Sequence, residues 1–166
     1  MATEKKYILS KEVVEKKLRR MAFEILENNI DEKEIILAGI RESGSVVAKV
    51  IQEMLGKISS IKTELITITL DKKEPTDVSL SRSIDLNGKV IILIDDVSNS
   101  GKTLLYALKP FIEFQPKKIQ TLVLVERTHT SFPVRPDYVG LSIATTFQEH
   151  IFVEVQGEVV MGAYLK

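Results

Sequence analysis

The chain has 166 residues, of which 44% are hydrophobic and 28% charged, a composition typical of one folded globular domain. Its 23 basic and 23 acidic residues give a formal net charge of zero, which argues against a general electrostatic attraction to nucleic acid or acidic membranes. The absence of cysteine excludes disulfides, thiolate metal sites and a cysteine nucleophile. A charged N-terminus and the lack of an apolar run of membrane-spanning length predict a cytoplasmic protein without a membrane partner.

The spacing of the apolar residues predicts helices and strands in alternation along the chain. Ser10 can cap a first helix through its hydroxyl, and the apolar residues of that helix recur at helical spacing from Val14 to Leu26. The later elements follow from near-continuous apolar runs, from helical periodicity or from β-branched composition. In chain order they are a strand at 34–40, a helix with its buried side at 46–55, strands at 62–70 and 90–94, a helix at about 102–114, and strands at 121–125 and 151–155.

The near-continuous apolar runs predict strands that are buried on both faces, with helices between them. This pattern is typical of a single α/β domain with an open, mostly parallel sheet flanked by helices. In such sheets ligands bind outside the carboxyl ends of the strands, where three polar segments fall, 41–44, 71–88 and 95–103. The middle segment is longer than most connections in compact domains and has no periodicity, so we expect a mobile functional loop there.

The segment VIILIDDVSNSGKT, residues 90–103, passes from a buried strand through two acids into a small polar turn. Backbone N–H groups at the start of the next helix have no intrahelical partner and favour an anion. Gly101 lets the backbone curl closely around a phosphate, and Ser100 and Thr103 add hydroxyl donors. The turn lacks the glycine spacing of a Walker P-loop. It predicts a phosphate cradle of another kind.

Asp95 and Asp96 directly precede this turn. Carboxylates beside a phosphate site usually accept hydrogen bonds from sugar hydroxyls or hold Mg²⁺ through water, so the two acids favour a phosphorylated sugar as the ligand. Adjacent strand residues face opposite ways, and we therefore expect the chain to bend at this point. In the alternative interpretation Asp95 only caps the turn, and the loop is a plain connection.

The same segment resembles the signature of the type I phosphoribosyltransferases, which is a hydrophobic strand, two acids, a variable pair and Thr-Gly-Lys/Arg-Thr, with Ser100 in place of the usual threonine. The stretch ILAGIRESG, 36–44, resembles the pyrophosphate loop of that family. The stretch VLVERTHTSFPVRPDYVG, 123–140, is similar to a segment of the pyrimidine-operon regulators that also act as uracil phosphoribosyltransferases. The first helix and EHIFVEV, 149–155, match in order and spacing, so the resemblance covers nearly the whole chain.

The resemblance implies a pentosyltransferase of nucleotide salvage with a small hood over the base site. Such an enzyme transfers the ribose 5-phosphate of 5-phosphoribosyl-1-diphosphate (PRPP) to a nucleobase, releases pyrophosphate, uses Mg²⁺, and forms a homodimer or homotetramer. Asp95, Asp96 and Arg41 would be catalytic, and both aspartates would hold ribose hydroxyls and Mg²⁺ through water. The 5′-phosphate would lie on Ser98, Asn99, Ser100, Gly101, Lys102 and Thr103, and the pyrophosphate on Ile40, Arg41, Glu42, Ser43, Gly44, Lys72 and Lys73.

Asn99 and the 123–140 segment bear on the choice of base. Several purine-specific members of the family carry an aspartate at the position of Asn99, and the neutral amide of asparagine is a poor general base. Uracil is therefore the favoured base. The alternative is a purine phosphoribosyltransferase. The resemblance places Arg127 and His129 at the base. The alternatives are an ion-pair partner for Arg127 and a surface or packing role for His129.

Two non-enzymatic hypotheses remain open. The segment Asp71-Lys72-Lys73 stands where the pyrimidine regulators carry a Tyr-Arg pair. The ammonium of a lysine does not reproduce the bidentate contact of an arginine guanidinium. One alternative is therefore a non-catalytic regulator that binds PRPP or a nucleotide. The other is a pyrimidine-responsive attenuator that binds RNA, which would need a basic face. The candidates for that face are Lys16, Lys17, Arg19, Arg20, Lys117 and Lys118, and the four helical ones spread around the helix axis.

Overall fold

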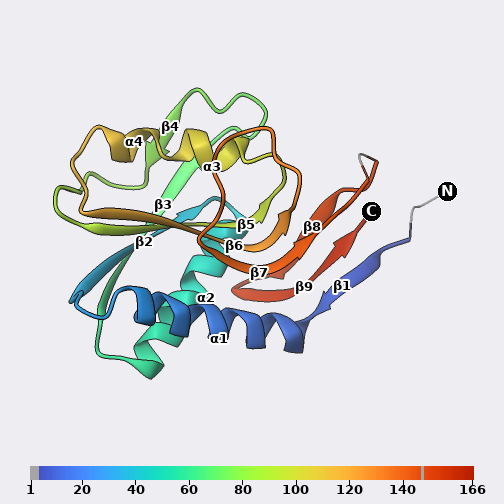
Figure 1. Ribbon diagram of the computed structural model, residues 1–166, viewed down its shortest axis with the longest axis horizontal. Coiled ribbons are helices and arrows are strands. Elements are labelled where there is room, and N and C mark those ends of the chain that lie inside the picture. The colour runs from blue at the N-terminus through green and yellow to red at the C-terminus, as the bar shows by residue number, and fades with distance from the viewer. Residues whose placement is uncertain (1–3, 147) are drawn as a thin grey trace.

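The computed structural model describes residues 4–146 and 148–166, whose strands form two sheets (Figure 1). The N-terminal half contains β1 (Lys6–Ser10), α1 (Lys11–Asn28), β2 (Glu34–Ile40), α2 (Ser43–Ile58), β3 (Lys62–Leu70) and β4 (Val78–Leu80). The C-terminal half contains β5 (Val90–Ser98), α3 (Lys102–Ala107), α4 (Lys109–Ile112), β6 (Lys118–Arg127), β7 (Tyr138–Ile143), β8 (Ile151–Gln156) and β9 (Val159–Leu165).

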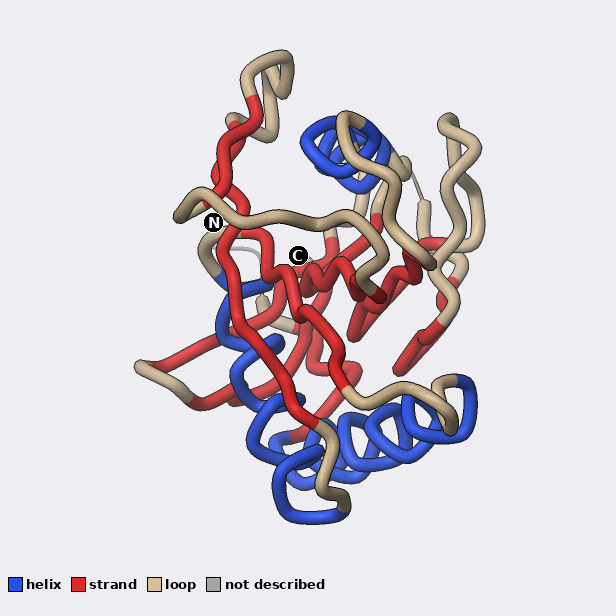
Figure 2. Tube along the Cα trace, turned by 90° about the vertical axis from the view of Figure 1, so that its left-hand side faces the viewer, coloured by secondary structure: helices blue, strands red, loops and turns tan. Residues whose placement is uncertain are grey.

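The larger sheet has the strand order β4-β3-β2-β5-β6-β7. All neighbouring strands in it are parallel except β4, which is antiparallel to β3. Helices α1 and α2 cover one face of this sheet, and α3 and α4 cover the other (Figures 1 and 2). Side chains along β2 and β5 therefore alternate between two hydrophobic clusters, which explains their near-continuous apolar sequence. The predicted open, mostly parallel sheet flanked by helices is confirmed.

The smaller sheet joins the two ends of the chain in the order β1-β9-β8, with antiparallel pairing throughout. It stands beside the larger sheet in Figure 1, and β8 contacts both β5 and α2. The sheet buries Leu9, Ile151 and Ala163 in the cluster that also holds α1 and α2. It thereby places β8 next to the carboxyl end of β5.

Helix α1 begins where the sequence predicts. The Val13 N–H donates a hydrogen bond to Ser10 Oγ over 3.3 Å, which caps the first turn. The helix buries Val14, Leu18, Met21, Ala22 and Ile25. In the described part of the chain, no helix combines the length and the apolarity needed to cross a membrane.

Two secondary-structure predictions were wrong. The expected helix over 102–114 is divided at Leu108 into α3 and α4, because Pro110 has no N–H to donate and its ring crowds the carbonyl one turn earlier. The segment 71–88 also contains a strand that the sequence did not predict, while the mobility expected of it stays a prediction. It contains β4, which pairs with β3, and it buries Leu86 in the hydrophobic cluster on the α3 side of the sheet.

Candidate functional site

A cavity of about 400 Å³ opens at the carboxyl end of β5. It lies between the start of α2, the segment after β3, the turn before α3, and strand β8 of the smaller sheet. Its walls comprise Ser43, Lys72, residues 96–104 and residues 151–153. The three polar segments that the sequence assigns to this edge therefore each contribute at least one residue to the same cavity, and β8 closes its remaining side.

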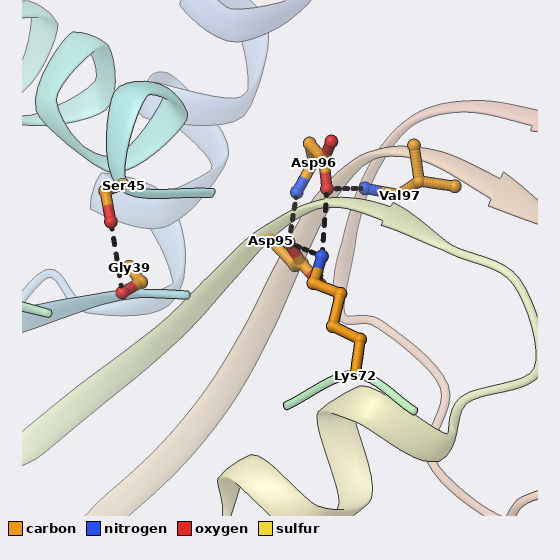
Figure 3. A network of polar contacts seen from close by, with 6 residues as sticks. All are labelled: Gly39, Ser45, Lys72, Asp95, Asp96 and Val97. Carbon is orange, nitrogen blue, oxygen red and sulfur yellow. Dashed lines mark hydrogen bonds and ion pairs between the residues drawn. The ribbon is translucent and has the colours of Figure 1, made fainter. Parts of the chain in front are cut away.

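Asp95 and Asp96 converge although they are neighbours in one strand. The Asp95 side chain is fully buried, and that of Asp96 is 14% exposed. The Asp96 N–H donates to Asp95 Oδ1 over 2.9 Å, and the Val97 N–H donates to Asp96 Oδ1 over 2.8 Å (Figure 3). Strand β5 runs on to Ser98, so the bend that we predicted is wrong. Side-chain rotation back onto the main chain brings the two carboxylates together instead.

Lys72 supplies the positive charge beside this pair. Its Nζ lies 3.4 Å from both carboxylate oxygens of Asp95 and 3.7 Å from Asp96 Oδ1 (Figure 3). Burial raises the pKa of the Asp95 carboxyl well above its usual value, the Asp96 charge raises it further, and Lys72 opposes both. Burial works to lower the pKa of the Lys72 ammonium, but the attraction of the two carboxylates prevails and raises it. The three groups form one electrostatic unit.

The predicted phosphate cradle, residues 98–103, lines the cavity along its whole length. Ser98 Oγ is buried there and has no hydrogen-bond partner within the described residues. The Ser100 carbonyl accepts hydrogen bonds from the N–H groups of Ser131 and Phe132 over 3.0 and 3.1 Å, which fixes the loop from outside. Gly101 adopts φ 86°, and a Cβ there would lie 3.2 Å from the Phe132 carbonyl oxygen. This cramped, left-handed position favours glycine.

The predicted pyrophosphate loop, 40–44, meets the cavity through Ser43. Ile40 is buried in the hydrophobic cluster on the α3 side of the sheet. The Arg41 side chain is 61% exposed and lies 3.9 Å from the Glu42 carboxylate, and the peptide bond between these two residues is cis. Gly44 packs directly on Asp95, because a Cβ there would lie 3.0 Å from Asp95 Oδ1 and 2.8 Å from the Ile94 carbonyl oxygen.

The two lysines assigned to pyrophosphate behave differently. Lys72 lines the cavity but contacts the aspartate pair. The backbone N–H of Lys73 donates to Asp71 Oδ1 over 2.8 Å, and its exposed side chain is not part of the cavity wall. The sequence therefore placed one of these lysines at the cavity, although the contact that Lys72 makes with the acids was not foreseen.

A second cavity of about 680 Å³ adjoins the first and shares Asn99 and Ser100 with it. It contains the two residues assigned to the base. The Arg127 guanidinium donates to the Glu149 carbonyl oxygen over 2.6 Å, while Arg127 Nε is buried without a partner among the described residues. His129 is exposed on the wall. The full lining is Asn99, Ser100, Arg127, His129, Ser131, Thr145 and Thr146.

Sequence reasoning missed Thr145 and Thr146 in this second cavity and residues 151–153 in the first. The two threonines follow β7, in which only two of the six residues are buried. Because this strand has no continuous apolar run, the sequence did not indicate that the threonines lie at the edge of the sheet. The similarity of residues 149–155 to the family was a signal for β8, but it did not show which side of the cavity the strand closes.

The arrangement offers three kinds of chemistry in one connected space. The convergent carboxylates can accept hydrogen bonds from a diol or hold a hydrated divalent cation. The cradle with the unpartnered Ser98 hydroxyl offers donors to a phosphate. The second cavity places the guanidinium of Arg127, an imidazole and several hydroxyls around a space large enough for a heterocyclic ring.

Comparisons with known proteins agree with this geometry. The phosphoribosyl transferase domain family matches residues 5–157. A relative from Streptococcus pneumoniae, named bifunctional protein PyrR, is 34% identical over 156 residues, and the match covers 90% of each chain.

Solved structures show the same fold. The hypoxanthine phosphoribosyltransferase of Trypanosoma cruzi superposes with a TM-score of 0.76 at 15% identity, over 86% of this chain and 83% of that one. A hypoxanthine-guanine phosphoribosyltransferase of Bacillus anthracis gives a TM-score of 0.75 at 20% identity, over 95% of both chains.

Proposed function

The chain belongs to the phosphoribosyltransferase family, and from this premise we propose that it transfers the ribose 5-phosphate of PRPP to a nucleobase, preferably uracil, and releases pyrophosphate. One observation carries the proposal. Asp96 and the 98–103 cradle line one cavity at the carboxyl end of β5, the fully buried Asp95 lies beside Asp96, and a second cavity suited to a ring adjoins the first. A sugar with a phosphate on one side and a base on the other fits that order.

Asp95 and Asp96 would bind the ribose hydroxyls, and Ser98 to Thr103 would bind the 5′-phosphate. The buried Ser98 hydroxyl supports this assignment, because a buried polar group without a partner costs free energy that a phosphate oxygen would recover. The pyrophosphate would lie against Ile40 to Gly44, with Ser43 as the side chain that faces the cavity. Arg41 and Lys73 remain proposed contacts that need their exposed side chains to move toward it.

The site also fits Mg²⁺, which the family is expected to use. Asp95 and Asp96 would hold it through water, with the exposed edge of Asp96 toward the cavity. When bound, the ion would supply positive charge that neutralises the pyrophosphate as it leaves.

The reaction is a displacement at C1 of the ribose, in which a base nitrogen replaces pyrophosphate through an oxocarbenium-like state. Such a reaction depends on stabilising the leaving group and excluding water more than on a protein nucleophile. The cradle and Ser43 line the cavity in which the charged groups would lie, and residues 151–153 of β8 form the part of its wall that belongs to the smaller sheet.

The proposal is tested by measuring pyrophosphate release from PRPP and Mg²⁺ with a panel of free bases. We expect turnover with uracil to exceed turnover with hypoxanthine and guanine, because Asn99 provides an amide at the base-side wall in place of a carboxylate. Faster turnover with a purine would move the assignment to the purine alternative. Binding of PRPP without turnover of any base would favour the non-catalytic regulator.

His129 offers a sharper test of the base site. Replacing it with alanine removes one hydrogen-bonding group worth about 0.5–1.5 kcal/mol, so we expect uracil turnover to fall by about two- to tenfold while PRPP binding is unchanged. The control is His150→Ala. His150 lies edge-on to Phe152 with ring centroids 6.5 Å apart and is not part of the second cavity. Equal effects of the two substitutions on uracil turnover would remove His129 from the base site.

The RNA-binding hypothesis and the homo-oligomer stay predictions. Several cations proposed for an RNA-binding face already have partners within the chain. Arg20 pairs with Glu24 over 3.1 Å, Lys117 pairs with Glu32, and Lys118 donates to the Asn28 carbonyl oxygen over 2.9 Å. An RNA-binding face built on these residues would compete with those contacts, so the charge arrangement adds no support to the RNA-binding hypothesis.

A further inference from the structure

Lys72 occupies the position at which the proposed function needs a divalent cation and a diol. Its ammonium lies 3.4 Å from both oxygens of Asp95 and 3.7 Å from Asp96 Oδ1. Lys72 comes from the segment between β3 and β4, far from the two acids in sequence. Among the described residues, it is the cation that forms an ion pair with either of them.

The aspartate pair needs this charge in the free protein. Asp95 is fully buried, and an uncompensated buried carboxylate is strongly destabilising. Each carboxylate also accepts one backbone N–H, because Asp95 Oδ1 accepts the Asp96 N–H and Asp96 Oδ1 accepts the Val97 N–H. An ammonium within 3.4 Å of both Asp95 oxygens and 3.7 Å of Asp96 Oδ1 places a positive charge where a second cation would lie, and the two cations would repel each other.

We propose that Lys72 is a built-in counter-cation, which occupies the Asp95–Asp96 pair in the free protein and must leave it before Mg²⁺ and PRPP bind there. This proposal rests on the proposed function. Its consequence is an order of events: Mg²⁺ alone binds weakly because the ammonium repels it, and the metal enters with PRPP, whose diphosphate supplies further ligands. Removing the lysine charge opens the pair to the metal alone.

The release of Lys72 requires little rearrangement. Its side chain is 46% exposed, and the ammonium is at the end of a flexible four-carbon chain. Rotation of that chain within the cavity therefore suffices to move the ammonium away from the acids. Lys72 and Ser43 both line this cavity. An ammonium displaced toward Ser43 would contact the pyrophosphate. Lys72 would then bind the aspartate pair in the free protein and the pyrophosphate in the complex, which is the role that the sequence assigns to it.

The decisive variant is Lys72→Met, which keeps the stem and removes the charge. Calorimetry with Mg²⁺ alone should show at least about tenfold tighter binding to this variant than to the wild type, because the repulsion between the ammonium and the metal is gone. Thermal unfolding in EDTA should occur at a lower temperature in the variant, and Mg²⁺ should raise its unfolding temperature more than that of the wild type.

Two controls complete the experiment. Lys73→Met removes the neighbouring charge, and Lys72→Arg keeps a charge at the site, so both should bind Mg²⁺ alone as weakly as the wild type. Equal Mg²⁺ affinity of wild type and Lys72→Met, or an equal gain in Lys73→Met, would overturn the proposal. Titration of wild type with PRPP and Mg²⁺ together tests the proposed function separately, since a lack of PRPP binding would refute that function without changing the result for Mg²⁺ alone.

Discussion

Replacing Asp95 and Asp96 together with asparagine should lower PRPP-dependent pyrophosphate release by about 10²- to 10⁴-fold, since each carboxylate would lose a charge-assisted hydrogen bond to the ribose worth about 1.5–3 kcal/mol. The substitution keeps the shape of both side chains. The oxygens that accept the N–H groups of Asp96 and Val97 can persist as amide oxygens, so these contacts between side chain and main chain of β5 should survive. Initial rates with uracil and calorimetry with PRPP and Mg²⁺ measure the loss.

The matched control for that double variant is Asp31→Asn. Asp31 is an exposed acid in the turn before β2, at the amino end of the sheet and therefore opposite the cavity. We expect the Asp31→Asn variant to release pyrophosphate at the wild-type rate and to bind PRPP with wild-type affinity. Circular dichroism and thermal unfolding should establish that the double variant is folded. A folded double variant with wild-type PRPP affinity would show that the aspartate pair does not bind the sugar.

Gly44→Ala should damage the site through packing alone. The added Cβ would lie 2.8 Å from the Ile94 carbonyl oxygen and 3.0 Å from Asp95 Cα and Oδ1, so the start of α2 or the buried aspartate must move. Overpacking of this kind costs about 1–3 kcal/mol of stability. Because the displaced groups are the ones proposed to hold the sugar and the pyrophosphate, we expect turnover to fall by at least about tenfold.

Gly56→Ala is the matched control, because it places the same methyl group in the same helix. Apart from its chain neighbours and the nearby backbone of its own helix, a Cβ at Gly56 would have no heavy atom within 4 Å. This substitution should stabilise the protein by about 0.5–1 kcal/mol, since alanine is the better helix former, and should leave turnover unchanged. Thermal unfolding and initial rates compare the two variants. Equal activity of Gly44→Ala and wild type would mean that the contact between α2 and Asp95 does not position the site.

The central strands could be predicted from sequence because both of their faces are buried. Residues 34–40 and 90–94 are almost wholly apolar, and β2 and β5 cover or extend these ranges. Strands β1, β8 and β9 belong to a small antiparallel sheet with mixed burial, so their patterns are weak, and of these three only β8 was foreseen. The apolar residues around Pro110 recur at helical spacing, so the sequence predicted one continuous helix although the proline divides it.

The candidate site likewise has parts that could be predicted from the sequence and parts that could not. The acids and the cradle were found because they lie within one short segment, 95–103, in which strand, turn and helix start follow each other directly. The contact of Lys72 with Asp95 joins residues that are far apart in sequence, and no local pattern encodes it. The assignment of Arg41 came from its place in the loop, but the direction of its side chain depends on the conformation of that loop, where the structure shows it 61% exposed.

A crystal structure of the protein with PRPP and Mg²⁺ is the sharpest test of the proposed site. The expected result is a 5′-phosphate within hydrogen-bond distance of the 98–103 cradle and of Ser98 Oγ, ribose hydroxyls on Asp95 and Asp96, and a Lys72 ammonium displaced from both acids. PRPP bound elsewhere, or bound at this cavity while Lys72 keeps its contacts with the aspartate pair, would contradict it.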